Sequence, residues 1–156
     1  MSITQPIIRA ARANEHALLS ELSLRSKGHW GYDSAFLEAC RKELTISPRF
    51  IKETWVFVIE VAGRVAGFYS LAKENEQVDL NNLFVEPAYI GHGYGKQLWL
   101  HAVKNATQQG FKLMTIEADP YAKLFYEAMG AKVVDEAPSN SVSGRMLPLL
   151  HYRFPP

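Results

Sequence analysis

The sequence predicts one mixed α/β domain over residues 1–156, in which helices flank a mixed, mostly antiparallel sheet. Three observations predict it. β-rich runs and helical patterns follow one another in the order βααβββαβαβ. The middle of the chain reads as a three-strand meander, and no repeat or low-complexity linker divides the sequence. A chain of 156 residues is also long enough to bury most of its apolar surface in one core.

The first elements are a short strand and two helices. The run PIIRAA reads as a strand, and Ala13 to Lys27 has the apolar spacing of an amphipathic helix. A second helix is expected over about Asp33 to Leu44. The run SKGHWGYD between them is turn-like but carries two large aromatic residues, which is more typical of a functional loop than of a plain connection.

The meander begins at Thr54. The run TWVFVIEVAGRVAGFYSLA contains two β-rich segments around Gly63 and Arg64, which predicts an antiparallel hairpin, and QVDLNNLFV supplies the third strand. Polar residues on both faces of a central strand are costly if they are buried without partners, so this strand indicates a cavity. Simple alternation of side chains along the strand puts Asp79, Asn81, Leu83 and Val85 on one face. It puts Leu80, Asn82 and Phe84 on the opposite face.

The remaining elements alternate between helix and strand. Pro87 ends the meander, and a glycine-rich run leads into the helix GKQLWLHAVKNATQQG, which Gly110 caps. After the strand FKLMTIEA, the segment DPYAKLFYEAMG predicts a short helix with Asp119 as its N-cap. A strand begins at AKVV, and the tail RMLPLLHYRF reads as a final strand.

Charge and cysteine content exclude several classes of protein. Lys plus Arg number 17 and Asp plus Glu number 16, so no electrostatic argument favours nucleic acid or an anionic membrane as a partner. The lone Cys40 excludes an internal disulfide and a cysteine metal cluster, and we expect no metal. No run has the length of a signal peptide or a membrane span, so we expect a cytoplasmic protein.

The glycine-rich run AYIGHGYGKQL lies between a strand and a helix, an arrangement that binds phosphate through free N–H groups. A Walker A loop needs a glycine where Ile90 stands and a hydroxyl where Gln97 stands. A Rossmann fingerprint would place Lys96 at its third glycine, and an antiparallel meander precedes the run. Neither ATP hydrolysis nor NAD binding is therefore expected.

The segment NNLFVEPAYIGHGYGKQLW resembles motif A of the GNAT superfamily of acetyl-CoA-dependent N-acetyltransferases, with Gly93 and Gly95 at its glycine positions. Ile90 stands where the family usually has Gln or Arg. The segment DPYAKLFYEAMGA resembles the second signature of the family, with Asp119 in place of the usual Asn and Ala131 in place of Phe. The order of elements also matches over nearly the whole chain, so the resemblance implies a GNAT-like fold.

The resemblance implies acetyl-CoA as cosubstrate. Backbone N–H groups from His92 to Lys96 would hold the pyrophosphate, and the strand edge at Phe84 and Val85 would pair with the pantetheine arm as an added strand does. That pairing needs a splayed gap beside the strand, typically produced by a bulge. The expected cofactor-binding residues are Phe84, Val85, Gly91, His92, Gly93, Tyr94, Gly95, Lys96 and Asp119.

The resemblance also implies catalytic residues. Tyr126 matches the tyrosine of the second motif and would give a proton to the departing thiolate, although its helical spacing equally suits a core residue. Asp79 lies on the strand where many relatives carry a catalytic or water-positioning carboxylate, and its alternative is a solvated carboxylate. His29 is another possible base, and we expect His29, Trp30, Tyr32 and Asn81 near the acceptor. Arg145 can recognise an acceptor carboxylate or lie free on a loop.

The sequence as a whole predicts an N-acetyltransferase that moves an acetyl group to a primary amine by direct attack in a ternary complex. The acceptor is a small-molecule or peptide amine, and a homodimer is possible by analogy with relatives. The alternative is a non-catalytic module that binds or senses acyl-CoA. The sequence leaves open the identity of the amine, the length of the acyl chain, the general base and the oligomeric state.

Overall fold

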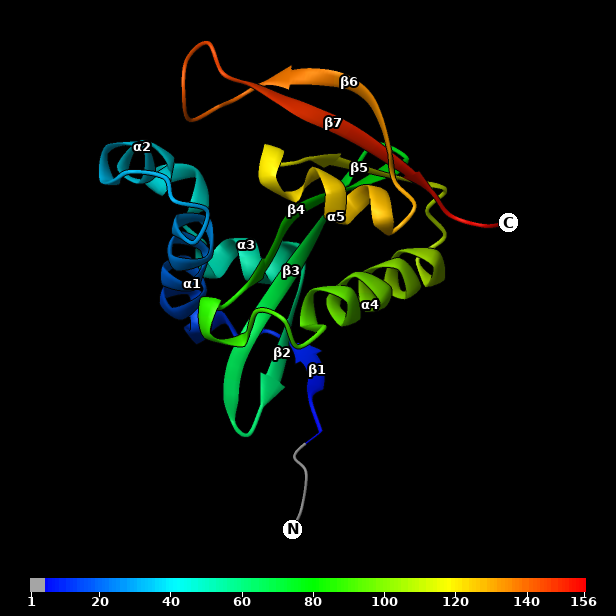
Figure 1. Ribbon diagram of the computed structural model, residues 1–156. Helices are drawn as coiled ribbons and strands as arrows, with labels where there is room; N and C mark the ends of the chain where they lie inside the picture. Colours follow the sequence, from blue (N-terminus) through cyan, green and yellow to red (C-terminus); the bar gives the residue numbers. More distant parts are fainter. Residues whose placement is uncertain (1–4) are drawn as a thin grey trace.

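The computed structural model describes residues 5–156, which form a seven-stranded sheet with helices on both faces (Figure 1). The strands are β1 (Ile7–Ala10), β2 (Trp55–Val61), β3 (Arg64–Glu74), β4 (Gln77–Val85), β5 (Leu113–Glu117), β6 (Lys132–Pro138) and β7 (Met146–Arg153). The helices are α1 (His16–Gly28), α2 (Ser34–Leu44), α3 (Pro48–Glu53), α4 (Tyr94–Gln108) and α5 (Lys123–Ala128), with short 3₁₀ turns η1 (Ala13–Glu15), η2 (Pro87–Tyr89) and η3 (Pro120–Ala122).

The mixed, mostly antiparallel sheet agrees with the fold class predicted from the sequence. Its strand order is β1-β2-β3-β4-β5-β7-β6, and β4 and β5 are its parallel pair. The structure adds the helix α3, which begins where the Ser47 side chain accepts a hydrogen bond from the Phe50 N–H and Pro48 occupies the first turn. The two strands predicted at AKVV and RMLPLLHYRF are both present, as β6 and β7, so the predicted order βααβββαβαβ is one strand short.

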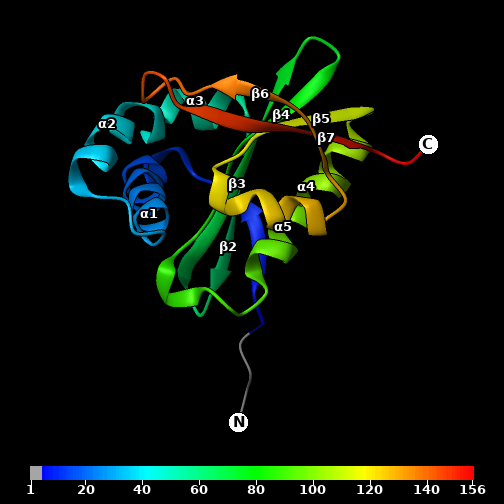
Figure 2. The same ribbon diagram turned by 45° about the horizontal axis from the view of Figure 1, so that its top comes forward.

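Two groups of helices cover the two faces of the sheet. Helices α1 and α3 pack on one face, where Leu19 and Ile51 meet Phe68 of β3. Helix α4 packs on the other face through Leu98 and Trp99, beside α5. Figures 1 and 2 show α1, α2 and α3 on one side of the central strands and α4 and α5 on the other. No helix of residues 5–156 is long and apolar enough to cross a membrane.

A bulge in β4 overturns the simple alternation predicted for this strand. Ser70 of β3 pairs with Asn82, whereas the next residue, Leu71, pairs with Leu80, so Asn81 is the extra residue. The extra residue reverses the face of every side chain that follows it. Leu80 therefore packs in the same core cluster as Leu83 and Val85, although alternation placed it opposite them.

The bulge also changes the position expected for Asp79. Val78 and Leu80 both belong to the core cluster on the α4 face, so Asp79 between them faces the α1–α3 side. Phe84 packs on that same side. Asp79 consequently shares a face with Phe84, and the prediction that grouped it with Leu83 and Val85 is wrong.

Strands β4 and β5 pair over a very short distance. Val78 pairs with Met114 and Asp79 pairs with Thr115, after which β4 continues to Val85 with no partner on this edge among residues 5–156. β5 instead continues its pairing with β7 on its other edge, as far as Glu117. The sheet therefore opens between two neighbouring strands, and one edge of β4 is left free to bind an extended ligand.

Gly67 allows β3 to approach β4 closely beside this opening. A Cβ atom at Gly67 would lie 2.6 Å from the backbone oxygen of Phe84 and 3.2 Å from a methyl carbon of Leu98. Both distances are shorter than ordinary van der Waals contact, and a backbone atom has little freedom to move away. The position of the β4 edge therefore depends on a residue without a side chain.

We predict that Gly67→Ala lowers the free energy of unfolding by about 1–3 kcal/mol, the usual cost of overpacking. Gly95→Ala is the matched control, because a Cβ there would lie 3.6 Å from the Phe125 ring in ordinary contact. That variant should keep its stability or gain up to about 1 kcal/mol, since alanine favours helix. Urea unfolding followed by circular dichroism measures both, and equal midpoints for Gly67→Ala and wild type would contradict the argument.

Candidate active site

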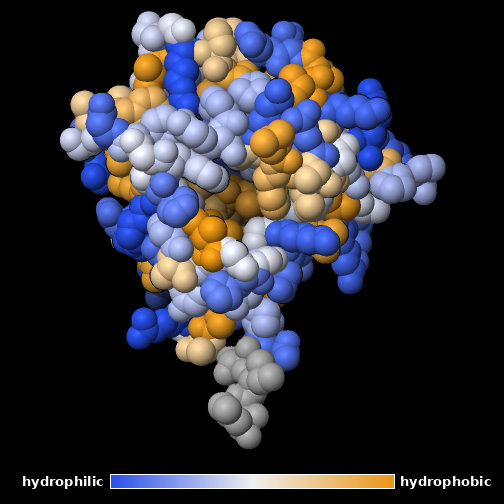
Figure 3. Space-filling view, in the orientation of Figure 1, coloured by the Kyte–Doolittle hydropathy of each residue, from blue (hydrophilic) through white to orange (hydrophobic). Residues whose placement is uncertain are grey.

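A cleft of about 740 Å³ occupies the gap between β4 and β5. Its walls come from both faces of the sheet: the ends of α1 and α2, the glycine-rich loop, α5 and the β6–β7 loop all contribute. The space-filling view shows a hollow near the centre of this face, with hydrophobic residues in its walls and hydrophilic residues around them (Figure 3). Residues from both faces of the sheet can therefore contact a ligand in the cleft.

The glycine-rich loop presents a row of free backbone N–H groups to the cleft. Within the described chain, no hydrogen bond uses the N–H groups of residues 91–96 as donors, and the first bond of α4 runs from Gln97 N–H to the Gly93 oxygen. Gly93 is the N-cap and has a φ of 80°, a left-handed conformation that favours glycine. Free N–H groups and the positive end of a 15-residue helix together form a cradle that is suited to an anion.

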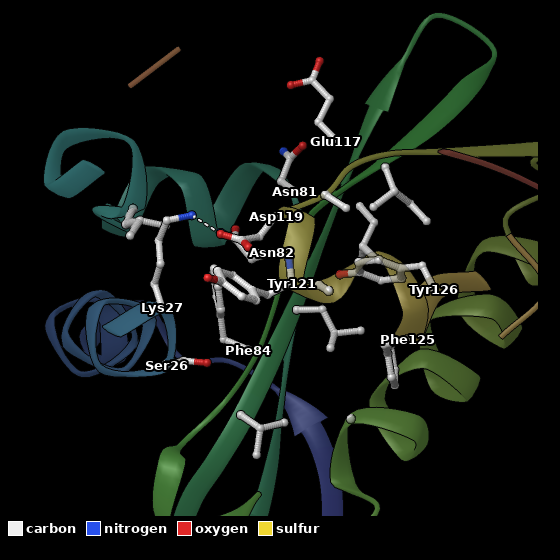
Figure 4. Close-up of a pocket in the computed structure, with 18 of the residues that line it drawn as sticks. Ser26, Lys27, Asn81, Asn82, Phe84, Glu117, Asp119, Tyr121, Phe125 and Tyr126 are labelled. Atoms are coloured by element: carbon white, nitrogen blue, oxygen red, sulfur yellow. Dashed lines mark hydrogen bonds and ion pairs between the residues drawn. The ribbon is translucent and has the colours of Figure 1, made fainter. Parts of the chain in front are cut away.

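Tyr126 lies on the opposite wall of the cleft from α1. Its side chain is 6% exposed, and it packs against Trp99 and Phe125. Its hydroxyl has no hydrogen-bond partner in residues 5–156 and is open to the cleft, because no fully buried polar side-chain atom there lacks a partner. Burial, reinforced by the charge of Asp119, raises the pKa of Tyr126 well above its usual range, so the phenol stays protonated. Figure 4 shows Phe125 and Tyr126 on one side of the cleft and Ser26 and Lys27 on the other.

Two carboxylates lie where β4 and β5 begin to separate. Asp79 accepts a hydrogen bond from the Thr115 hydroxyl across the parallel pair, and both residues line the cleft. Glu117 lies two residues further along β5 and near Asn81 (Figure 4). Burial, with the charges of Glu43 and Asp79, raises the pKa of Glu117. Glu117 is thus a second candidate for the proton acceptor, and it was not predicted from the sequence.

Four side chains tie three segments of the chain together beside the cleft. We call Lys27, Tyr32, Asp119 and Arg145 the clasp. The Tyr32 hydroxyl donates to Asp119 and accepts a hydrogen bond of 2.6 Å from Arg145 Nη2, while Lys27 Nζ lies 3.0 Å from Asp119 Oδ2. The clasp therefore fixes the α1–α2 loop and the β6–β7 loop against η3.

The clasp changes the ionisation of its members. Burial raises the pKa of Asp119, but the Tyr121 N–H, the Lys27 ammonium and the Tyr32 hydroxyl outweigh burial, and the net pKa lies below the usual range. Burial and the charge of Asp119 raise the pKa of Tyr32 to about 12, although Arg145 opposes them. Asp119 is therefore a fixed anion at neutral pH, and Tyr32 is a neutral hydrogen-bond donor.

Most of the site residues predicted from the sequence line the cleft, and three do not. His29, Tyr32 and His92 are absent from its walls: His29 is exposed, Tyr32 belongs to the clasp and His92 stacks on Tyr94. The predicted residues that line it are Trp30, Asp79, Asn81, Phe84, Val85, Gly91, Gly93, Tyr94, Gly95, Lys96, Asp119 and Tyr126. Arg145 lines it too, as part of the clasp. The roles of all these residues remain predictions.

The structure adds cleft residues that the prediction did not select. Asn82 is 8% exposed and its Oδ1 accepts a hydrogen bond of 2.6 Å from Ser70. Glu43 reaches the cleft from α2, and Lys27 reaches it from the last turn of α1. Asn82 could have been selected from the sequence, because it is a polar residue in a strand that is otherwise largely apolar. Only the packing of α1 and α2 against the sheet reveals Glu43 and Lys27.

Comparisons with known proteins agree with the family resemblance found in the sequence. A family model described as "Acetyltransferase (GNAT) domain" matches residues 20–144. An Escherichia coli protein, "Uncharacterized N-acetyltransferase YjgM", is 31% identical over 88 residues. That alignment covers 52% of this chain and 53% of the relative, so the chain spans about half the length of the curated relative it matches.

Solved structures share the fold at low sequence identity. A PaiA N-acetyltransferase from Thermoplasma acidophilum, in complex with coenzyme A, superposes with a TM-score of 0.80 at 19% identity, covering 96% of this chain and 99% of that one. A structure described as yncA, a putative acetyltransferase from Salmonella typhimurium with its cofactor acetyl-CoA, gives 0.68 at 22% identity, covering 97% and 95%. With the family match over most of the sequence, these findings establish that the chain belongs to the GNAT acetyltransferase family.

Proposed function

We propose that this chain transfers the acetyl group of acetyl-CoA to a primary amine by direct attack in a ternary complex. The observation that carries the proposal is the free edge of β4 in the open sheet, next to the N–H groups of residues 91–96, which have no partner in the described part of the chain. An extended chain with amides at one end and a pyrophosphate at the other needs both features. Acetyl-CoA is such a molecule.

The cofactor-binding roles follow from this placement. The N–H groups of residues 91–96 hold the pyrophosphate, and the Lys96 side chain adds a positive charge at the same end of the cleft. The β4 edge at Phe84 and Val85 forms strand-like hydrogen bonds with the pantetheine amides. The thioester then lies near the bulge, where a backbone N–H of β4 can stabilise the oxyanion.

The reaction replaces a carbon–sulfur bond with a carbon–nitrogen bond, and it also needs two proton transfers. A primary amine has a reference pKa of about 10.4, so it enters mostly as an ammonium and must lose one proton before it attacks. Asp79 receives that proton through water, with Glu117 as the neighbouring candidate. The neutral nitrogen bonds to the thioester carbon, the carbon–sulfur bond breaks, and the electron pair stays on sulfur.

Tyr126 completes the transfer. Its protonated hydroxyl donates a hydrogen bond to the sulfur as negative charge develops there. The nitrogen releases a second proton when the amide forms, and this proton replaces the one that Tyr126 passes to the sulfur. The products are the acetylated amine and the free thiol, and the direct attack of the amine on the thioester requires no covalent enzyme intermediate.

We predict that Gly93→Asp weakens acetyl-CoA binding at least tenfold relative to Gly93→Asn, which corresponds to about 1.4 kcal/mol. Asp and Asn have the same shape and tolerate left-handed backbone similarly, so the pair isolates the added negative charge in the anion cradle. Isothermal titration calorimetry measures both dissociation constants. Equal affinity in the two variants would show that the cradle does not hold the pyrophosphate.

We predict that Tyr126→Phe lowers kcat about 100-fold while the KM for acetyl-CoA changes little, because general acid catalysis typically contributes a factor of that order or more. The substitution removes a hydroxyl without a hydrogen-bond partner in residues 5–156, so the fold should persist. Tyr152→Phe is the matched control, a tyrosine packed on Trp99 outside the cleft. Release of free thiol with an amine acceptor is the assay.

Two outcomes would count against parts of the proposal. If both tyrosine variants keep wild-type rates, Tyr126 is a core residue and does not assist the leaving thiolate. If the wild-type chain binds acetyl-CoA but acetylates no amine, it is a non-catalytic acyl-CoA-binding module.

A further inference from the structure

The part of the cleft that faces the acceptor carries an excess of negative charge. We define the acceptor half as the cleft-lining residues of the α1–α3 side, of β5 with η3, and of the β6–β7 loop, together with Asp79 and Asn82 of β4. Its charged side chains are the acids Glu43, Asp79, Glu117 and Asp119 and the bases Lys27 and Arg145. Four carboxylates against two cations give a formal charge of −2, in a chain whose formal net charge is +1.

Three of these carboxylates have no cationic partner. Among residues 5–156, no ion pair joins Glu43, Asp79 or Glu117 to a basic side chain. Glu43 and Asp79 interact instead with the hydroxyls of Ser141 and Thr115. The negative charges of Glu43 and Asp79 also raise the pKa of Glu117, so each of them repels the Glu117 carboxylate. A positively charged ligand would relieve that repulsion.

The two basic residues of this half are already engaged. Lys27 and Arg145 both face Asp119, and Arg145 also lies over the rings of Tyr32 and Phe36 at 5.2 and 4.7 Å from their centroids. An acceptor carboxylate would have to compete with Asp119 for them, in a cleft that is negative overall. The arrangement therefore disfavours the carboxylate-bearing acceptor that Arg145 suggested in the sequence.

Asn82 adds a hydrogen-bond donor to this half of the cleft. The side chain is 8% exposed, and its oxygen is occupied by the Ser70 hydroxyl, which leaves the amide nitrogen without a partner in the described chain. Asn82 lines the cleft beside Asp119 (Figure 4). Because no fully buried polar side-chain atom of residues 5–156 lacks a partner, this amide nitrogen is open to the cleft, where water or a bound molecule can accept its hydrogen bond.

The shape of the site fits an elongated ligand better than a single ion. In the part of the chain that the structure describes, no three acidic, His or Cys side chains are close enough together to bind one metal ion. Trp30 and Tyr121, which line the same half, stack at 5.4 Å with nearly parallel rings and form an apolar wall. Separated carboxylates and an apolar wall suit an alkyl chain with a cation at each end.

We propose that the acceptor is an alkyl diamine or polyamine, whose second ammonium group is held by Glu43 and Glu117 while its first is acetylated beside Asp79. The proposal rests on the proposed function and names its substrate class. Acetylation of one end removes one of the two positive charges, so the product binds the carboxylates less strongly than the substrate and leaves more readily.

The test compares three amines of similar length that differ at the far end: 1,5-diaminopentane, hexylamine and 5-aminopentanoate, which carry an ammonium, a methyl group and a carboxylate. We expect kcat/KM to be at least about tenfold higher for the diamine than for hexylamine, and lowest for 5-aminopentanoate. Glu43→Gln and Glu117→Gln should each reduce that preference severalfold. Glu136→Gln, an exposed change on β6 outside the cleft, should leave the preference unaltered.

Equal use of the diamine and hexylamine, or better use of 5-aminopentanoate, would overturn the proposal while leaving amine acetylation intact. If no amine is acetylated, titration calorimetry of the protein saturated with coenzyme A decides the matter without turnover. Tighter binding of 1,5-diaminopentane than of hexylamine, weakened by Glu117→Gln, supports the proposal. Equal or undetectable binding of both refutes it.

Discussion

The separation of β4 from β5 after two paired residues is the constraint on which the rest of the structure depends. A parallel pair that stops this early leaves an open edge inside the sheet, which a folded protein normally covers or fills. Here the gap becomes the cleft. The Asn81 bulge lies just beyond the last pair of β4 with β5, and Gly67 lets β3 approach β4 closely further along the strand. Both features are local, and both occur where β4 has already separated from β5.

The gap also brings the two chemical halves of the site together. On the α4 side it exposes the free N–H groups of the glycine-rich loop and the protonated Tyr126. On the α1–α3 side it exposes Asp79 and a surplus of carboxylates, with the clasp fixing the loops around them. An acyl donor whose pyrophosphate binds on the α4 side and a positively charged amine on the α1–α3 side would therefore enter the cleft from opposite faces of the sheet. The charged groups of the two substrates would then stay on opposite faces, and only the reacting atoms would come together.

The sequence predicted the fold class and the cofactor half of the site more completely than the acceptor half. The glycine-rich run and the α5 motif are contiguous segments, so Gly93, Gly95 and Tyr126 could be selected from local pattern alone. The Asn81 bulge has no signature in the run QVDLNNLFV, and a single extra residue reversed the faces assigned beyond it. Glu43, Lys27 and Glu117 meet only through tertiary packing, which spacing along the chain does not encode. Helix α3 was missed although Ser47 and Pro48 form an ordinary N-terminal signal.

The most direct test of the account is amide hydrogen exchange at residue resolution by NMR, with and without acetyl-CoA. The account predicts that the N–H groups of residues 91–96, which have no partner in the described chain, exchange fast in the free protein and slow down when acetyl-CoA is added, together with the free edge of β4 at Val85. Amides in the middle of α4 serve as the internal reference and should change little. Unchanged exchange at residues 91–96 in the presence of saturating acetyl-CoA would contradict the central claim that the open sheet and the start of α4 form the cosubstrate site.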